Sequence, residues 1–370
     1  MYRRSIALCL TILAVALALG FWTARTQAQA PPAQPQATIA PRSTAGAAYG
    51  SAVDPPAPKK HILILGFTEG FHHGSTSDAI GTIWQMGNES GLYDSEIRTD
   101  TKWISKSNVG SGEAHNLDWY DAIVAVNTTG IWQVNDQQKK DFISAIRDDG
   151  RGFVAVHAAL DANRGGAWPE YTEMVGGEFA AHPWIQFWAP VIVEDPSFPA
   201  MRHFPNTRML IYDEMYVPRS DTWSRSKVNV LMRMDEDQLP AEPGSQQPFA
   251  SYQALQAAGR AAAGGGAGRG GAGARGGPGG PAGRGAAGAQ GARRGGGAAD
   301  ARPRDNGIHP DKDYALAWAK TYGKGRVFYS SLGHTKLSWT QPDVKKMYLE
   351  GIKWTLGLTQ GSSATHPKVK

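Results

Sequence analysis

Three short apolar runs constrain the fold of this 370-residue chain more than any other feature. They cover residues 61–67, 120–127 and 152–156 and are dominated by Ile, Leu, Val, Ala and Phe. Runs of this kind are typical of parallel strands that helices cover on both faces. The sequence therefore predicts an α/β protein built on a mainly parallel sheet.

Helical patterns alternate with these runs. Residues 77–89 carry an apolar stripe, Asn135 can cap a helix that ends at Gly150, and Pro342 begins an amphipathic helix over 342–356. Such alternation predicts a doubly wound sheet with helices on both faces. Further strands are predicted at 93–100, 187–194, 209–217, 228–234, 314–322 and 326–332.

The first residues have the layout of a secretory signal peptide. Two arginines precede an apolar stretch from Ile6 to Gly20, and small residues follow up to Ala28. We expect cleavage after Ala28, so that residues 1–28 are removed and the protein is secreted or periplasmic. An uncleaved membrane anchor is the alternative; after cleavage no stable membrane insertion is expected.

Two other segments cannot build a core. Residues 29–59 are rich in Pro, Ala and Gln and are expected to form a disordered linker, and residues 257–304 are almost wholly Gly, Ala and Arg. We predict one α/β domain over residues 60–360, interrupted by this disordered insert and followed by a tail at 361–370.

The formal net charge of +5 comes from the segments outside the predicted core. The insert contains eight arginines and one aspartate, and the first 30 residues contain three arginines and no acid, so the rest carries a net charge of −5. A mildly acidic body does not favour nucleic acid as a partner.

The mature chain is expected to contain no cysteine. Cys9 is the only cysteine and lies in the predicted signal peptide. Disulfides, thiolate metal sites and cysteine nucleophiles are therefore excluded from the folded domain.

Four histidines follow predicted strands or lie in the loops after them: His73, His157, His182 and His334. Open α/β sheets form their ligand crevices at the carboxyl ends of strands, so these imidazoles are expected to converge there. The alternative for His157 is an ordinary buried histidine that is hydrogen-bonded within the core. For His73, next to His72, it is a solvent-facing side chain, and for His182 it is an ordinary polar residue of a loop.

Carboxylates and a tryptophan add to this set. Glu214 lies in an apolar stretch, where a buried acid is costly unless it is paired or used. Asp161 follows closely after His157, and Trp184 offers a flat face for a sugar ring.

At these positions the chain resembles the ThuA-like (trehalose utilisation) family. The resemblance covers nearly the whole predicted domain. It is carried by residues 71–75 (FHHGS), 150–159 (GRGFVAVHAA), 176–183 (GGEFAAHP), 213–216 (DEMY), 318–329 (WAKTYGKGRVFY) and 332–334 (LGH).

The resemblance implies a flavodoxin-like fold of the class I glutamine amidotransferase type and a link to sugar catabolism, particularly of oxidised, keto-containing glycosides. In the amidotransferases a cysteine nucleophile occupies the turn after a central strand. Here that turn carries His157, so glutamine amidotransferase activity is excluded.

We predict His157, His73 and Glu214 as catalytic residues, and His182, His334, Trp184 and Asp161 as contacts to a small carbohydrate. Two chemistries fit them. In one, two or three of His73, His157, His182 and His334 bind a divalent metal such as zinc, with Glu214 as a further candidate ligand, and a remaining histidine moves a proton; no HxH or HExxH spacing supports this. In the other, the histidines act as general acid and base without a metal.

A keto group acidifies the neighbouring C–H, so a histidine base would permit β-elimination or isomerisation of a keto-glycoside. Two other functions stay open at this stage. One is a glycoside hydrolase that uses Glu214 and Asp161 as its carboxylate pair. The other is a non-catalytic sugar-binding module of the periplasm.

Overall fold

The computed structural model describes residues 58–107, 110, 114–240 and 302–369, all within one compact unit. The predicted signal peptide lies outside the described residues, as do nearly all of the predicted linker and insert. Within the described part of the chain, no helix is both long and apolar enough to cross a membrane.

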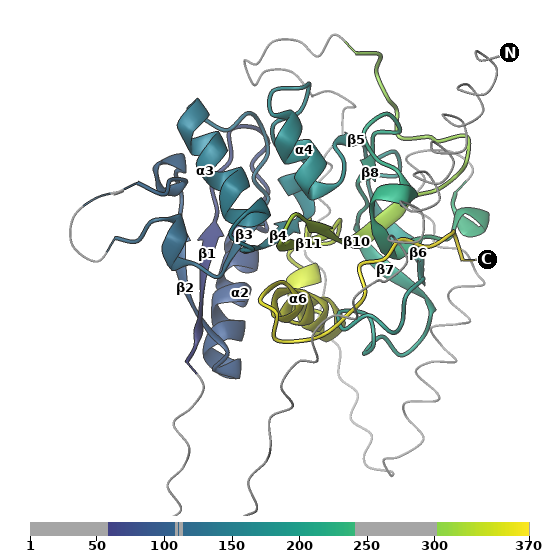
Figure 1. The fold of residues 1–370 in the computed structure, drawn as a ribbon. Coiled ribbons are helices and arrows are strands. Elements are labelled where there is room, and N and C mark those ends of the chain that lie inside the picture. The colour runs from purple at the N-terminus through teal and green to yellow at the C-terminus, as the bar shows by residue number, and fades with distance from the viewer. Residues whose placement is uncertain (1–57, 108–109, 111–113, 241–301, 370) are drawn as a thin grey trace, which may run out of the picture. The chain divides into compact units, whose positions relative to one another are not determined.

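One half of the nine-stranded sheet is parallel (Figure 1). Its strands lie in the order β2-β1-β3-β4-β11, and each pairs in parallel with its neighbours in that order. The buried runs predicted from the sequence form its centre. The strands are β1 (Lys60–Leu65), β2 (Tyr93–Arg98), β3 (Ala122–Val126), β4 (Gly152–Val156) and β11 (Gly325–Ser330).

The other half extends the sheet through antiparallel pairs in the order β11-β10-β9-β6-β7. A separate two-stranded sheet joins β5 to β8. The strands are β10 (Ala315–Tyr322), β9 (Asn229–Met234), β6 (Gln186–Val193), β7 (Arg208–Glu214), β5 (Phe179–Ala181) and β8 (Val217–Pro218).

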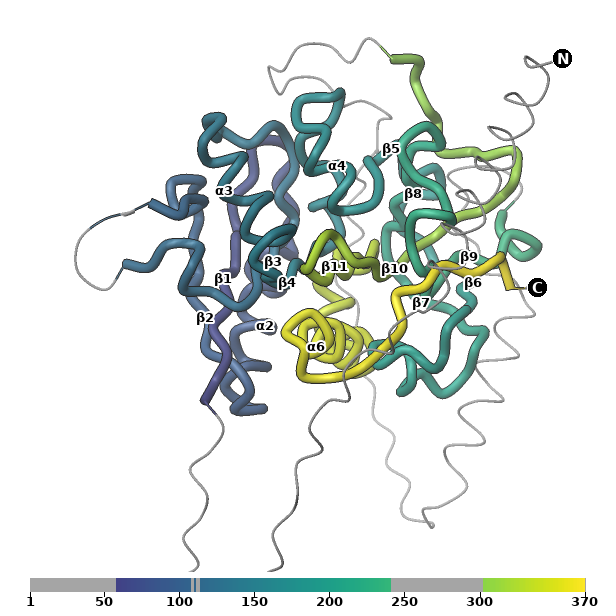
Figure 2. Tube along the Cα trace, viewed as in Figure 1, coloured from purple at the N-terminus to yellow at the C-terminus, as the bar shows by residue number. Residues whose placement is uncertain are grey.

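Helices cover both faces of the sheet, as Figures 1 and 2 show. On one face, α2 (Thr76–Ser90) and α6 (Pro342–Thr355) contribute to one core cluster. On the other, α3 (Asp136–Arg147) and α4 (Pro169–Val175) contribute to a second. The predicted α/β, doubly wound, flavodoxin-like class is therefore confirmed.

The predicted start signals of two helices are present. The Asn135 side chain accepts a hydrogen bond from the Gln138 backbone, and the Gln138 side chain accepts one from the Asn135 backbone. This reciprocal capping box satisfies two otherwise free donors at the start of α3. Pro342 occupies the first turn of α6, as predicted.

Two helical glycines provide a test of how closely the helices pack. Gly351 of α6 lies against β11, and a Cβ there would stand 2.8 Å from the ring of buried Phe328. Gly351→Ala should therefore lower the free energy of unfolding by about 1–3 kcal/mol through overpacking. Urea denaturation would measure this loss.

The matched control is Gly81→Ala, at an exposed position of α2 where a Cβ would meet nothing within 4 Å. Alanine should raise the stability there by roughly 0.5–1 kcal/mol, because it favours the helix. Equal effects of the two substitutions would contradict the close packing of α6 on the sheet.

Candidate active site

Three histidines and one glutamate converge at the carboxyl end of the parallel strands. His73, His157, His334 and Glu214 each offer a ligand atom, and these atoms all lie within 4.8 Å of one another. We call these four residues the His₃Glu cluster. His182 lies beside it, with Nδ1 3.7 Å from Oε1 of Glu214 and with 42% of its side chain exposed.

His157 occupies a sharp turn. It directly follows β4 and begins a 3₁₀ helix, His157–Asp161, with φ at 44°. Asn127, directly after the neighbouring strand β3, has φ at 51°. Left-handed backbone at such residues costs about 1–3 kcal/mol and is found where packing and function impose it.

Hydrogen bonds join the loops that carry the other histidines. Ser75, two residues after His73, donates from Oγ to the Gly333 carbonyl at 2.8 Å. The Asn127 amide lies 3.3 Å from Ser75 Oγ. The loops after β1, β3 and β11 are thus fixed to one another next to the cluster.

Asp213 brings the end of β7 to the same place. This carboxylate is fully buried and accepts from the backbone N–H of Gly333 at 2.6 Å and of Thr335 at 3.0 Å. It also accepts from Ser338 Oγ at 2.7 Å and from the Glu214 N–H at 3.0 Å. Burial raises the pKa of Asp213 to about 6, although all four donors act in the opposite direction.

The glycine before His334 permits a close approach. Gly333 has φ at 126°, and a Cβ would stand 3.1 Å from the Trp339 ring and 3.3 Å from Val156. Any side chain at Gly333 would push the loop after β11 away from the end of β4.

Hydrogen bonds orient two of the imidazoles. His157 donates from Nδ1 to the Ser331 carbonyl at 2.6 Å, because a carbonyl can only accept. His334 Nδ1 lies 2.9 Å from Oε2 of Glu214 and 3.3 Å from Nε2 of His157. The other nitrogen of His334, Nε2, lies 2.8 Å from the side-chain amide of Gln186.

Burial sets the charge states of the cluster. It lowers the pKa of His73 to about 4 and that of His157 well below its usual value, and the neighbouring histidines add to both shifts. For Glu214 burial acts to raise the pKa, but the hydrogen bond from His334 and the charges of nearby histidines outweigh it, so the pKa is lowered. At neutral pH the two most buried imidazoles are neutral and Glu214 is a carboxylate.

The remaining predicted residues lie in different settings. Asp161, at the end of the turn that begins at His157, pairs with Arg164 at 2.5 Å, and burial raises its pKa to about 7. Trp184 requires a correction, because it is a core residue and offers no sugar-binding face. It is 4% exposed, packs against Phe187 and Tyr314, and donates from Nε1 to the Pro240 carbonyl.

Sequence reasoning missed two residues of the site. Gln186 contacts His334, and Tyr216 places its hydroxyl 3.5 Å from Nε2 of His73 and its ring 4.1 Å from that of His157. Burial raises the pKa of Tyr216 well above its usual value, so the hydroxyl keeps its proton. Tyr216 belongs to the DEMY motif and could have been found there, whereas no local pattern distinguishes Gln186.

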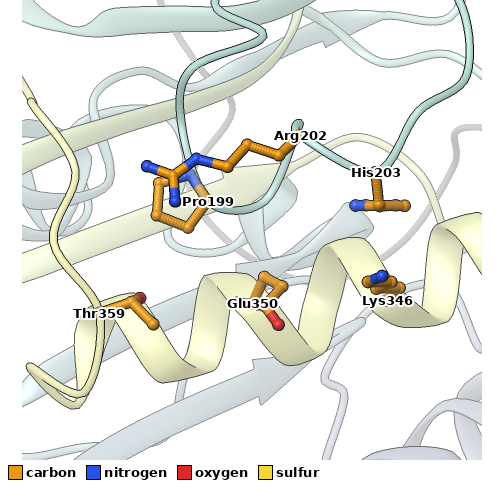
Figure 3. Close-up of a pocket in the computed structure, with 6 residues that line it drawn as sticks. All are labelled: Pro199, Arg202, His203, Lys346, Glu350 and Thr359. Atoms are coloured by element: carbon orange, nitrogen blue, oxygen red, sulfur yellow. The ribbon is translucent and has the colours of Figure 1, made fainter.

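A pocket of 260 Å³ lies away from the cluster, between α6 and the loop before β7. Figure 3 shows Lys346 and Glu350 on the helix below Arg202 and His203 of the loop. The pocket contains none of the predicted site residues. Its lining is Pro199, Arg202, His203, Lys346, Glu350 and Thr359.

The family model described as trehalose utilisation, ThuA, matches residues 61–265 and 298–355. The chain belongs to the ThuA family. This membership associates it with trehalose utilisation and carbohydrate metabolism. No curated protein is similar to the chain at a significant level.

Two solved structures are similar in fold. A protein described as ThuA-like from Bacteroides uniformis has a TM-score of 0.52 and 15% identity, over 84% of this chain and 95% of that one. Another, from Parabacteroides merdae, has a TM-score of 0.47 and 13% identity, over 84% of this chain and 93% of that one. The first supports the fold of this ThuA-family protein.

Removing one acceptor oxygen of Asp213 should loosen the site. Asp213→Asn keeps the shape but turns an NH₂ group toward two of the four donors, so the free energy of unfolding should fall by roughly 2–4 kcal/mol. Chemical denaturation would measure the loss. The control Asp148→Asn removes only an exposed pair with Arg147 and should leave the midpoint unchanged. Equal midpoints for the two variants would contradict the role of Asp213.

Proposed function

We propose that this ThuA-family protein is an exported enzyme of carbohydrate catabolism that acts on a sugar or keto-glycoside by histidine-based chemistry. The observation that carries the proposal is the convergence of three imidazoles and one carboxylate within 4.8 Å. The family description adds the carbohydrate context. Export rests on the signal-like pattern of residues 1–28 alone.

The chemistry starts from the carbonyl of a keto-sugar. A keto group acidifies the C–H on the adjacent carbon, and a base that removes this proton leaves an enolate on the carbonyl oxygen. When the enolate re-forms the carbonyl, a C=C bond forms, the bond to the glycosidic oxygen on the next carbon breaks, and that oxygen leaves as an alcohol after taking up a proton; this completes a β-elimination. Return of the proton to the former carbonyl carbon, with transfer of a hydroxyl proton to oxygen, completes an isomerisation.

The solvent exposure of each histidine suggests its role in the reaction. His157 and His73 are buried, so a substrate that enters from solvent does not meet them first. His182 is half-exposed and close to Glu214, which makes it the histidine that a substrate entering from solvent meets first. We assign proton transfer to His182, whose Nδ1 lies 3.7 Å from Oε1 of Glu214, and orientation of the carbonyl to the buried histidines.

The glycoside hydrolase alternative has less support. A hydrolase needs two carboxylates facing one bond, one of them as the acid. Glu214 is surrounded by histidines, and Asp161 is already paired with Arg164. A non-catalytic sugar-binding module could use the same residues, and only a measurement of turnover distinguishes it from an enzyme.

The test is mass spectrometry of products after incubation with plain and 3-keto disaccharides. We expect turnover of the keto sugars only. Glu214→Gln and His182→Asn should each reduce it by roughly 10²–10⁴-fold, the usual contribution of an acid–base group. His203→Asn, in the separate pocket of Figure 3, should leave turnover unchanged.

Three outcomes would count against the proposal. Equal turnover of plain disaccharides would favour the hydrolase. Binding of sugars by folded protein without any product would favour the binding module. Full activity in both the Glu214 and His182 variants would place the chemistry elsewhere.

A further inference from the structure

We infer that the His₃Glu cluster is a binding site for one divalent transition-metal ion of the zinc class. Its role in catalysis rests on the proposed function, but binding itself can be measured without any substrate. Two kinds of observation support the inference: the spacing of the donor atoms, and the hydrogen bonds that orient the imidazoles from behind.

The donor atoms are spaced as the ligands of one ion would be. His334 Nδ1, His157 Nε2 and Glu214 Oε2 are separated by 2.9, 3.3 and 3.8 Å. Ligands bound at about 2.0–2.1 Å from a common tetrahedral ion stand about 3.3 Å apart. Only small side-chain shifts are needed for the three atoms to share an ion.

The hydrogen bond of His157 leaves the correct nitrogen free. Because Nδ1 donates to the Ser331 carbonyl, the neutral ring carries its lone pair on Nε2, the atom that faces His334 and Glu214. Histidines that bind metals commonly donate their other N–H to a carbonyl or carboxylate in this way.

Gln186 can serve His334 in the same manner. Its amide nitrogen lies 2.8 Å from Nε2 of His334, on the side of the ring away from Glu214. With the amide oxygen turned toward the ring, Gln186 accepts from Nε2–H and leaves the Nδ1 lone pair facing the cluster. The oxygen and nitrogen of a glutamine amide are exchangeable by a simple flip.

A cation would also relieve an imbalance within the cluster. His73 is buried, and its Nε2 makes a long contact of 3.5 Å with the Tyr216 hydroxyl. The ring of His73 stands 5.0 Å from those of both His157 and His334. One carboxylate cannot satisfy three imidazoles held this close, whereas one ion accepts a lone pair from each.

The donor set indicates the class of metal. Three imidazole nitrogens and one carboxylate suit Zn²⁺ and its first-row neighbours, while Ca²⁺ and Mg²⁺ prefer oxygen ligands. When bound, such an ion would polarise a sugar carbonyl as a Lewis acid. His182 lies outside the set and is left to move a proton.

The experiment measures metal binding by the whole, tag-free protein. After chelator treatment and dialysis, the protein is titrated with ZnCl₂ by calorimetry, and its zinc content is determined after gel filtration. We expect about one tightly held zinc per chain. MgCl₂ and CaCl₂ should give no comparable binding. With CoCl₂, visible absorption should report imidazole coordination.

Variants identify the site. His334→Ala, His157→Asn and Glu214→Gln should each weaken zinc binding by at least about 100-fold, and Gln186→Leu by about 10–100-fold. Gln186→Glu keeps an acceptor behind His334 and should bind zinc as tightly as the wild type. His203→Ala and His115→Ala, remote from the cluster, control for adventitious zinc on surface histidines. Circular dichroism checks that each variant is folded.

The outcomes separate the two proposals. Zinc binding that no cluster variant weakens, or its absence from the folded wild type, would overturn the metal site. Loss of binding in Gln186→Glu, with binding kept in Gln186→Leu, would overturn the orientation assigned to His334. If zinc binds but no keto sugar is turned over, the proposed function fails and the metal site stands. Full turnover by zinc-free protein would overturn the role of the metal in catalysis, while the binding site itself is judged by the titration alone.

Discussion

The site depends on one buried carboxylate that is not itself part of the cluster. Asp213 accepts hydrogen bonds from the loop after β11 and from the backbone of Glu214, and so fastens the end of β7 to that loop. Three strands separate β7 from β11 in the sheet order. Without these hydrogen bonds, nothing in this part of the site would hold Glu214 and His334 close to each other.

Burial gives the cluster its chemical character. Imidazoles that lose water become neutral, because the charged form is the one that burial penalises. The single carboxylate remains charged because His334 donates a hydrogen bond to it and the charges of nearby histidines stabilise it. A compact group of neutral nitrogen donors around one anion suits a cation or an electrophilic carbonyl, and both of our proposals use this property.

Much of the fold could be predicted because its signals are local. The three central strands of the parallel half, β1, β3 and β4, are apolar runs, and Asn135 and Pro342 mark where α3 and α6 begin. The short helix α4 and the β5–β8 pair were not predicted, because segments of this length carry too little periodicity. Trp184 was misjudged because an exposed and a buried tryptophan look the same in sequence.

The sequence by itself determined where the elements lie and that His157 and His334 follow strands of the sheet, since both facts depend on neighbouring residues. Only the tertiary structure decided which side chains meet. Glu214 and Gln186 come from antiparallel strands, β7 and β6, whose ends face the histidines through sheet pairing and the contacts of Asp213. Such long-range hydrogen bonds leave no periodic trace along the chain, so no local pattern could have revealed them.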